Sequence, residues 1–170
     1  MKYYIYPFIL FIAALSINMS AQTMNNDNPF FKEYTTPFQT PPFDQIKEAH
    51  YLPAFEEGIK IKRNELDVII NNPEKPTFKN TIEAIEKSGE LLTKVSRVFF
   101  NISGSNGNDE TQKIAETITP ELSKLSNDIY LNEILFKKIK SINDEKEKLN
   151  LTSEQLKVLD NYYTDFVRNG

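Results

Sequence analysis

The sequence predicts an all-α protein in which about five helices form an antiparallel, bundle-like array behind an extended N-terminal arm. From about residue 44 to residue 170, apolar residues recur at every third or fourth position, which is the period of a helix with one buried face. No stretch of useful length alternates as a strand would, and only five glycines occur. Because the chain has no cysteine, stability must come from the helical core rather than from disulfides.

Length and charge narrow the possible classes of protein. A chain of 170 residues is about the size of one domain with a single core. Its hydrophobic content of 39% and charged content of 26% are ordinary for a globular protein and exclude wholesale disorder. A net charge of −4 gives no electrostatic reason to bind nucleic acid or an anionic membrane.

Residues 1–22 have the layout of a secretory signal peptide. Lys2 precedes an apolar run from Phe8 to Ile17, and small and polar residues follow. The run is shorter than the stretch of about 20 residues that spans a membrane. We expect cleavage near Ala21 or Gln22 and a periplasmic or secreted mature chain without a membrane anchor. The alternative is that the segment stays uncleaved as an anchor.

Residues 23–43 are predicted to be a linker and an extended aromatic arm. The segment begins with polar residues and contains four prolines, which exclude a long helix and bias the preceding residues toward extended geometry. Aromatic residues from Phe30 to Phe43 are too many for a free tail. We expect this arm to lie across a hydrophobic surface of the helical domain, residues 44–170.

The first two long helices are predicted from their caps and their apolar faces. Asp44 can cap a short turn through Ala49, and Pro53 fits the first turn of a helix that stops before the NNPEKP segment. Asn80 and Glu83 form a capping-box variant at the start of the second helix. The apolar faces are Leu52, Phe55, Ile59, Leu66, Ile69 and Ile70 in the first helix, and Ile82, Ile85, Leu92, Val95, Phe99 and Ile102 in the second.

Glycines mark two further features of the second helix. Gly89 falls where a large side chain would otherwise stand on the apolar face, which favours a close crossing with another helix. The SGSNGND segment at residues 103–109 is predicted to end the helix as a loop.

Three more helices complete the prediction. The third begins near Asp109, with Gln112 three residues on, and Pro120 is expected to kink or split it. The fourth is capped near Asn132, and the fifth opens with the capping box of Thr152 and Gln155. The apolar faces are Ile114, Ile118, Leu122, Leu125 and Ile129, then Leu135, Phe136, Ile139 and Ile142, then Leu156, Leu159, Tyr163, Phe166 and Val167.

The residues needed for catalysis or metal binding are mostly missing. His50 is the only histidine and cysteine is absent, so no H-E-x-x-H zinc helix or thiolate site can be written. Asp44, Glu48, Glu56 and Glu57 flank His50, but Glu56 and Glu57 suit the favourable dipole of a helix start. We predict that His50 caps backbone groups or packs on a neighbouring ring. No catalytic or metal-binding residue is predicted, and the substrate-binding residues stay unknown.

Several long segments resemble a known family. They read, in order, NPFF, TPFQTPPFDQIKEAHYLPAFEEGI, NNPEKPTFKNTIEAIEKSGELLTKVSRVFFNISGSN, ITPELSKLSNDIYLNEILFKKI and LTSEQLKVLDNYYTDFVRNG. From about residue 28 to residue 170 the chain closely resembles the N-terminal region of the M3 zinc metallopeptidases, in their bacterial peptidyl-dipeptidase and oligopeptidase A-like branch.

The resemblance implies a fold of many α-helices in two lobes around a deep channel, with this region in the lobe that covers the channel. It further implies that the full-length protein cleaves short peptides with one zinc ion, held by an H-E-x-x-H helix and a downstream glutamate. The peptidyl-dipeptidase branch releases dipeptides from the C-termini of peptides. No residue of this chain matches the zinc ligands or the general base, which lie further C-terminal in the family.

Two hypotheses follow. The first is a truncated N-terminal fragment of an exported peptidyl-dipeptidase, cut at Gly170 and inactive alone, whose zinc, short-peptide substrates and catalytic part belong to the full-length enzyme. The alternative is a stand-alone, non-catalytic helical module that binds peptides or a partner subunit. A fragment should expose Leu159, Tyr163 and Phe166, whereas a module should bury them within itself, because monomers rarely expose large apolar patches.

Overall fold

The computed structural model describes residues 27–170, so the predicted signal peptide and the first residues of the linker lie outside the described part. Within it the all-α prediction is confirmed, and residues 27–170 contain no strand. The helices are α1 (Glu48–Ile70), α2 (Ala84–Lys87), α3 (Glu90–Asn106), α4 (Asp109–Tyr130), α5 (Glu133–Asp144) and α6 (Ser153–Asn169). Among these residues, no helix is both long and apolar enough to cross a bilayer.

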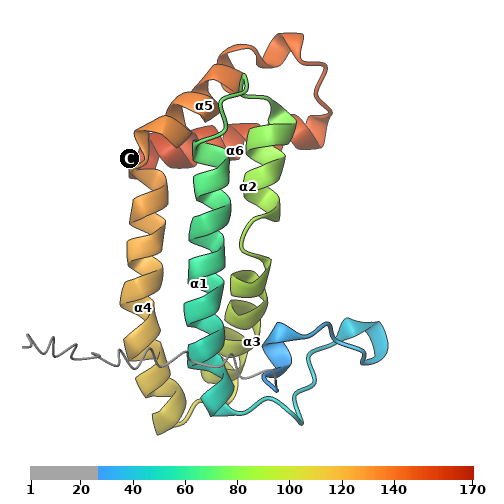
Figure 1. Ribbon diagram of the computed structural model, residues 1–170, viewed down its shortest axis with the longest axis vertical. Coiled ribbons are helices and arrows are strands. Elements are labelled where there is room, and N and C mark those ends of the chain that lie inside the picture. Colours follow the sequence, from blue (N-terminus) through green and yellow to red (C-terminus); the bar gives the residue numbers. More distant parts are fainter. Residues whose placement is uncertain (1–26) are drawn as a thin grey trace, which may run out of the picture.

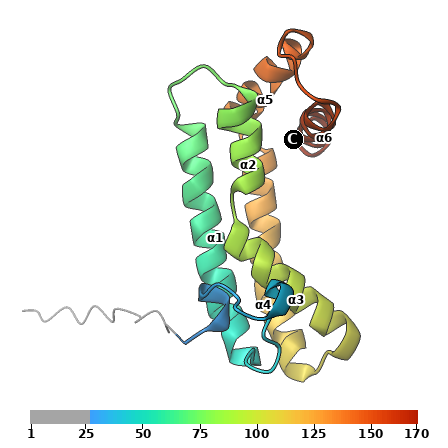
Figure 2. The same cartoon turned by 90° about the vertical axis from the view of Figure 1, so that its right-hand side faces the viewer.

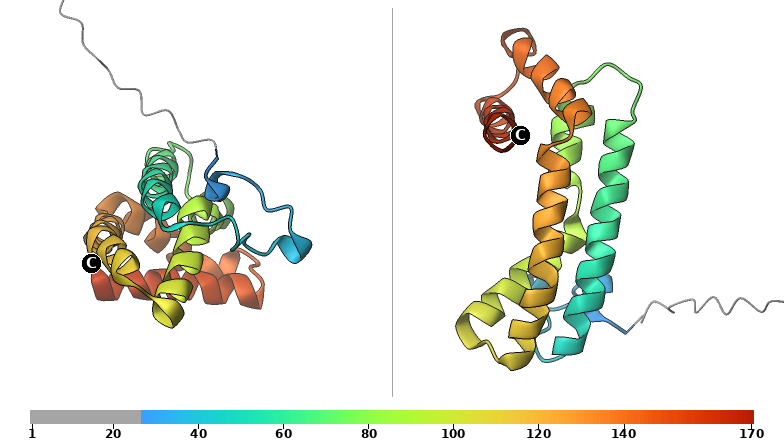
Figure 3. Two further views of the ribbon diagram at one scale, coloured as in Figure 1. Left: turned by 90° about the horizontal axis from the view of Figure 1, so that it is seen from below. Right: turned by 90° about the vertical axis from the view of Figure 1, so that its left-hand side faces the viewer.

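The long helices form a bundle that is closed at one end by α5 and α6. Figure 1 shows α1 and α4 running in one direction, with α2 and α3 returning in the other direction beside them. Helices α5 and α6 lie across the upper end of this bundle, and α6 is seen end-on in Figure 2 and in the right-hand view of Figure 3. The last two helices therefore cap the bundle rather than extend the antiparallel array.

Two hydrophobic clusters fill the interior, and α1 and α4 contribute to both. The lower cluster is built around Phe30, Tyr51, Phe55, Val95, Phe99 and Ile118. The upper cluster is built around Leu66, Ile82, Leu135, Ile139, Leu159 and Phe166. Helix α6 therefore buries Leu159 and Phe166 inside this chain, while Val167 on the same helix stays exposed.

The start of α1 differs from the prediction. The helix begins at Glu48 with Lys47 as its N-cap residue, and Pro53 lies inside it rather than in its first turn. Asp44 is exposed in the preceding turn and caps no helix. Glu56 and Glu57 consequently stand beyond the first turn, where the helix dipole favours them little. Local sequence signals located the helix correctly but placed its start too late.

The second predicted helix is divided in two. Thr77 and Asn80, rather than Asn80 and Glu83, form the capping box, and the first turns over residues 78–83 are π-helical. The chain then breaks at Gly89, which has a φ of 74° and precedes α3. Figure 2 shows α3 slanting away from the axis of α2 beyond this break. Gly89 is therefore the left-handed residue at which the helix breaks, and it does not mark a helix crossing.

The remaining helix boundaries agree with the prediction in part. Helix α3 runs to Asn106, so most of the predicted loop at 103–109 is helical. Asn108 caps α4, which continues through Pro120 as one uninterrupted helix, so the expected split does not occur. The caps at Asn132 and Thr152 are confirmed.

The aromatic arm is buried near both of its ends and exposed in its middle, at residues 37–40. Phe30 is buried in the lower cluster, in ring contact with Tyr51 at 5.5 Å between centroids. The following loop leaves the body of the protein, as Figure 1 shows, and carries Phe38 at its tip with 99% of its surface exposed. The prediction of an arm laid across the surface is wrong for residues 37–40, which stand exposed.

Candidate functional site

The single histidine organises the start of α1. Its Nδ1 accepts a hydrogen bond from the backbone N–H of Lys47 at 3.0 Å, and its carbonyl oxygen accepts one from the Asn28 side chain at 2.9 Å. Because Nδ1 accepts, that nitrogen is unprotonated. Partial burial, and secondarily the charge of Lys47, lower the pKa of His50. The predicted capping role is therefore confirmed.

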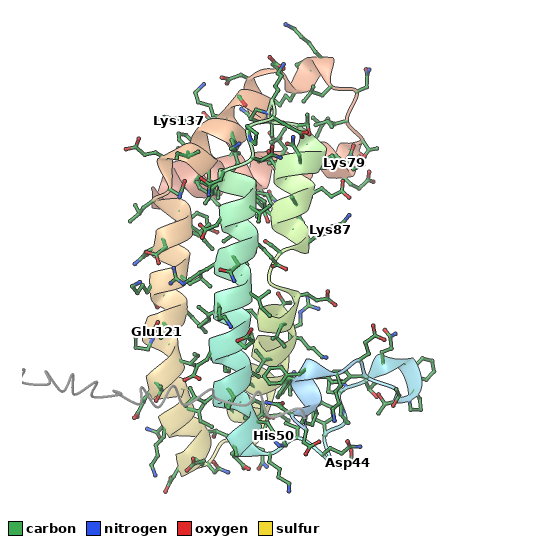
Figure 4. All side chains as sticks on the ribbon, in the orientation of Figure 1. Asp44, His50, Lys79, Lys87, Glu121 and Lys137 are labelled. Carbon is green, nitrogen blue, oxygen red and sulfur yellow. The ribbon has the colours of Figure 1, made fainter. Side chains whose placement is uncertain are left out.

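The acidic residues around His50 do not converge on a common point. Glu57 pairs with Lys60 at 3.0 Å, and Glu48 accepts a hydrogen bond from the Asn108 side chain at 3.3 Å. Figure 4 shows Asp44 on the loop before α1, apart from His50 at the first turn. In the part of the chain that the structure describes, no three His, Cys, Asp or Glu side chains could hold a metal ion together. These residues do not fit a zinc site.

A more closely built polar cluster lies at the break between α2 and α3. The ammonium group of Lys62, on α1, donates hydrogen bonds to the Ser88 hydroxyl at 2.6 Å, to the Ser88 carbonyl at 3.0 Å and to the Ile85 carbonyl at 3.4 Å. One turn further along α1, Glu65 accepts the backbone N–H of Gly89 at 2.6 Å. Burial lowers the pKa of Lys62, and the nearby glutamates oppose this shift.

A lysine beside a serine is an arrangement that some hydrolases use for nucleophilic catalysis. Here the Ser88 hydroxyl donates a hydrogen bond to the Ile85 carbonyl at 2.6 Å, so its hydrogen does not point toward a base. Lys62 donates hydrogen bonds to this hydroxyl and to two backbone carbonyls, and it does not accept one from the serine. The cluster therefore caps two helix ends at once. Lys62 caps the C-terminal end of α2, and Glu65 caps the N-terminal end of α3. The cluster was not predicted from the sequence, although a Ser-Gly pair inside a helical pattern is a signal for such a break.

A cavity of about 440 Å³, open to solvent, lies between the arm and α3. Lys94 holds the arm in place by donating to the carbonyls of Phe30 at 3.1 Å and Lys32 at 2.6 Å, and its ammonium lies 3.9 Å from the centre of the Tyr34 ring. The buried Tyr34 hydroxyl has no hydrogen-bond partner among residues 27–170. Burial raises the pKa of Tyr34 to about 12. The cavity is lined by Glu33, Tyr34, Gln39, Pro41, Glu90, Thr93, Lys94, Arg97 and Val98.

None of these places combines a nucleophile, a base and an open position for a substrate. The described part of the chain is helical and carries a surface cavity.

No family model matches the chain. It is 43% identical over 143 residues to a dipeptidyl carboxypeptidase of Salmonella typhimurium, and 44% identical over 147 residues to a dipeptidyl carboxypeptidase of Escherichia coli. These matches cover 84% and 86% of this chain but 21% and 22% of the two relatives. Oligopeptidase A of Escherichia coli is 24% identical over 135 residues, which are 79% of this chain and 20% of that protein.

The chain is homologous to these M3 family peptidases and spans about a fifth of their length, at the N-terminal end. The resemblance found in the sequence is therefore confirmed.

Proposed function

We propose that this chain is the N-terminal helical part of an exported M3-type peptidyl-dipeptidase, which releases dipeptides from the C-termini of short peptides. The observation that carries the proposal is its identity of 43–44% with two dipeptidyl carboxypeptidases over most of its length. In this proposal the chain supplies part of the wall of the substrate channel. The zinc ion and the catalytic groups belong to the portion that the relatives have beyond the match.

The burial of the last helix supports a second candidate function. The expectation that a fragment exposes Leu159, Tyr163 and Phe166 is wrong, because Leu159 and Phe166 are buried and Tyr163 is half-buried. A helical unit that folds by itself would bury Leu159 and Phe166 within the chain, as this one does. On this alternative, the protein is a non-catalytic module that binds peptides or a partner subunit.

A chimera tests the first candidate directly. Residues 27–170 would replace the homologous N-terminal segment of the Escherichia coli dipeptidyl carboxypeptidase, and dipeptide release from a short peptide would be followed by mass spectrometry. We expect release by the chimera and none by the enzyme without its N-terminal segment. A chimera that folds and binds zinc but releases no dipeptide would favour the helical module.

The chain alone supplies the complementary test. Purified residues 23–170 should bind no stoichiometric zinc and release no dipeptides, because the described residues hold no suitable group of ligands. One equivalent of zinc per chain, lost in His50→Ala, would overturn this expectation.

Export and size can be tested together in the native source. An antibody against residues 44–170 would detect the product in the exported fraction, and its mass would be measured. A species several times heavier than this chain supports the peptidase. A species of about the mature length supports the helical module, and a product confined to the cell interior would overturn the proposed export.

A further inference from the structure

The sequence contains two Asn-Gly pairs, Asn106–Gly107 and Asn169–Gly170. In such a pair the asparagine side chain loses its amide most easily, because glycine has no β-carbon to hinder attack by its backbone nitrogen. Each asparagine is the last residue of a long helix, α3 for the first pair and α6 for the second. The surroundings of the two pairs differ, and this difference decides which of them is reactive.

The pair at the end of α6 is held by two hydrogen bonds. The N–H of Gly170 donates to the carbonyl of Phe166 at 3.0 Å, and the side-chain amide of Asn169 donates to the carbonyl of Asp165 at 2.8 Å. Loss of the amide requires the glycine nitrogen without its proton and the asparagine side chain turned toward it. Both hydrogen bonds must therefore break before this pair reacts.

The pair at the end of α3 has neither restraint. Among residues 27–170, the Asn106 side chain and the N–H of Gly107 make no hydrogen bond of normal geometry, and both residues are exposed. A β-carbon on Gly107 would lie 2.5 Å from the carbonyl oxygen of Ser103, so the path of the chain requires glycine here. The turn between α3 and α4, at the lower end of the bundle in the right-hand view of Figure 3, thus keeps a reactive pair at the surface.

We propose that Asn106 is a site of spontaneous deamidation, with the backbone nitrogen of Gly107 as the nucleophile. This nitrogen gives its proton to water and bonds to the side-chain carbonyl carbon of Asn106. The C–N bond of the amide breaks, and the leaving group takes up a proton and departs as ammonia. Water then opens the cyclic imide, at the side-chain carbonyl to give aspartate or at the main-chain carbonyl to give isoaspartate. The inference does not depend on the proposed function.

The new carboxylate stands where negative charge is unfavourable. The dipole of α3 opposes an anion at its C-terminal end, where Asn106 lies. Asn106 also lines a cavity together with Glu48 and Asn108, so the product adds a carboxylate near an existing one. Gly107 and Asn108 alone join α3 to α4, and isoaspartate lengthens the main chain by one carbon just before this short connection. Deamidation therefore loosens the turn between the two helices.

Peptide mapping by mass spectrometry tests the site. The purified, folded chain and the chain unfolded in urea are incubated at the same mildly alkaline pH, and the aspartate and isoaspartate products of both pairs are separated by chromatography. We expect folding to slow the reaction at Asn169 about tenfold or more, because two hydrogen bonds must open, and to slow it far less at Asn106. Equal slowing at the two sites, or stronger slowing at Asn106, would overturn the proposal.

Variants connect the reaction with the turn. Asn106→Gln keeps an amide but must close a larger ring, so it should form almost no product at this position and leave the reaction at Asn169 unchanged. The native chain should lose stability to urea during incubation and approach Asn106→Asp, which carries the charge from the start, whereas Asn106→Gln should keep its initial stability. Equal losses in the native chain and in Asn106→Gln would contradict the loosened turn.

Discussion

At the scale of single residues, Gly58 allows α1 and α3 to approach each other. A β-carbon at this position would lie 3.0 Å from the backbone nitrogen and Cα of Leu92. Backbone atoms cannot move aside as the end of a flexible side chain can, so the space is available only to glycine. The close crossing inferred from the sequence thus occurs at Gly58 on α1, while the glycine chosen for it, Gly89, serves the break before α3.

Gly58→Ala is expected to lower the free energy of unfolding by about 1–3 kcal/mol, because the added methyl group overpacks the helix contact. Gly104→Ala is the matched control, since a β-carbon there meets nothing within 4 Å and lies in α3. It should raise stability by up to about 1 kcal/mol through better helix propensity. Urea unfolding followed by circular dichroism measures both changes, and equal effects would refute the proposed contact.

His50 links the stability of the fold to pH. Its pKa is lowered from the ordinary value of 6.5 in the folded state, so the unfolded chain takes up its proton at higher pH. The contribution is complete above the ordinary pKa and is lost as the pH falls through the lowered value. Stability should therefore decrease in this window as the solution becomes more acidic.

The variant His50→Gln isolates this effect, because glutamine at the third helical position can still cap the backbone but does not titrate. We expect the stability of the variant relative to the native chain to be constant above about pH 7.5 and to improve toward about pH 5.5. Unfolding free energies over this range would decide the matter, and parallel curves would show that His50 does not titrate between the two states.

At the scale of elements, the junction between α2 and α3 depends on groups that α1 supplies. Lys62 neutralises the carbonyl end of α2, and Glu65 receives the first N–H group at the start of α3. A break in the middle of a helix leaves unpaired backbone groups at both new ends. Two side chains from a neighbouring helix satisfy them here, which explains why the break persists inside the bundle.

Lys62→Met keeps most of the aliphatic stem but removes the donor, and it should cost about 1–3 kcal/mol of stability because partly buried carbonyls lose their partner. Lys60→Met is the control, since the Lys60–Glu57 pair lies on the same helix and is exposed at its lysine. Its loss should stay within about 0.5 kcal/mol. Thermal or urea denaturation measures both, and a small effect of Lys62→Met would show that water caps the break adequately.

At the scale of the whole molecule, α1 and α4 join the two hydrophobic clusters. The lower cluster contains Phe99 from α3, and the upper one contains Leu135 from α5, and neither side chain is accessible to solvent. Helices α1 and α4 pass through both clusters. If such a helix unfolds at one cluster, it also loses backbone hydrogen bonds next to the other cluster. The chain should therefore unfold as a single unit despite its two clusters.

Phe99→Ala and Leu135→Ala test this coupling. Each should lower the unfolding free energy, by about 3–5 kcal/mol for the phenylalanine and about 2–5 kcal/mol for the leucine, and shift one common transition. Circular dichroism and tyrosine fluorescence would be compared, since the chain has eight tyrosines and no tryptophan. If Phe99→Ala produced a separate early transition while α5 and α6 stayed folded, the clusters would be independent.

Much of the candidate site could be foreseen from local sequence, and part could not. The cap by His50 was predictable because it acts three residues away, on Lys47. The contact of Lys62 with Ser88 joins residues 26 positions apart, one on α1 and one in the break between α2 and α3, and no local pattern reveals such a pair. Phe38 illustrates the same limit, since its aromatic character predicted burial, but only the path of the loop decides what surrounds it.

The sequence by itself determined the class of fold, the positions of most helices and the family relationship. Helical periodicity and caps depend on residues a few positions apart, and homology depends on the order of residues alone. Only the tertiary structure decided that α5 and α6 lie across the bundle, that Leu159 and Phe166 are buried, and that Phe38 is exposed. These features depend on which apolar faces meet across long sequence separations, where many pairings satisfy the same periodic pattern and packing selects one.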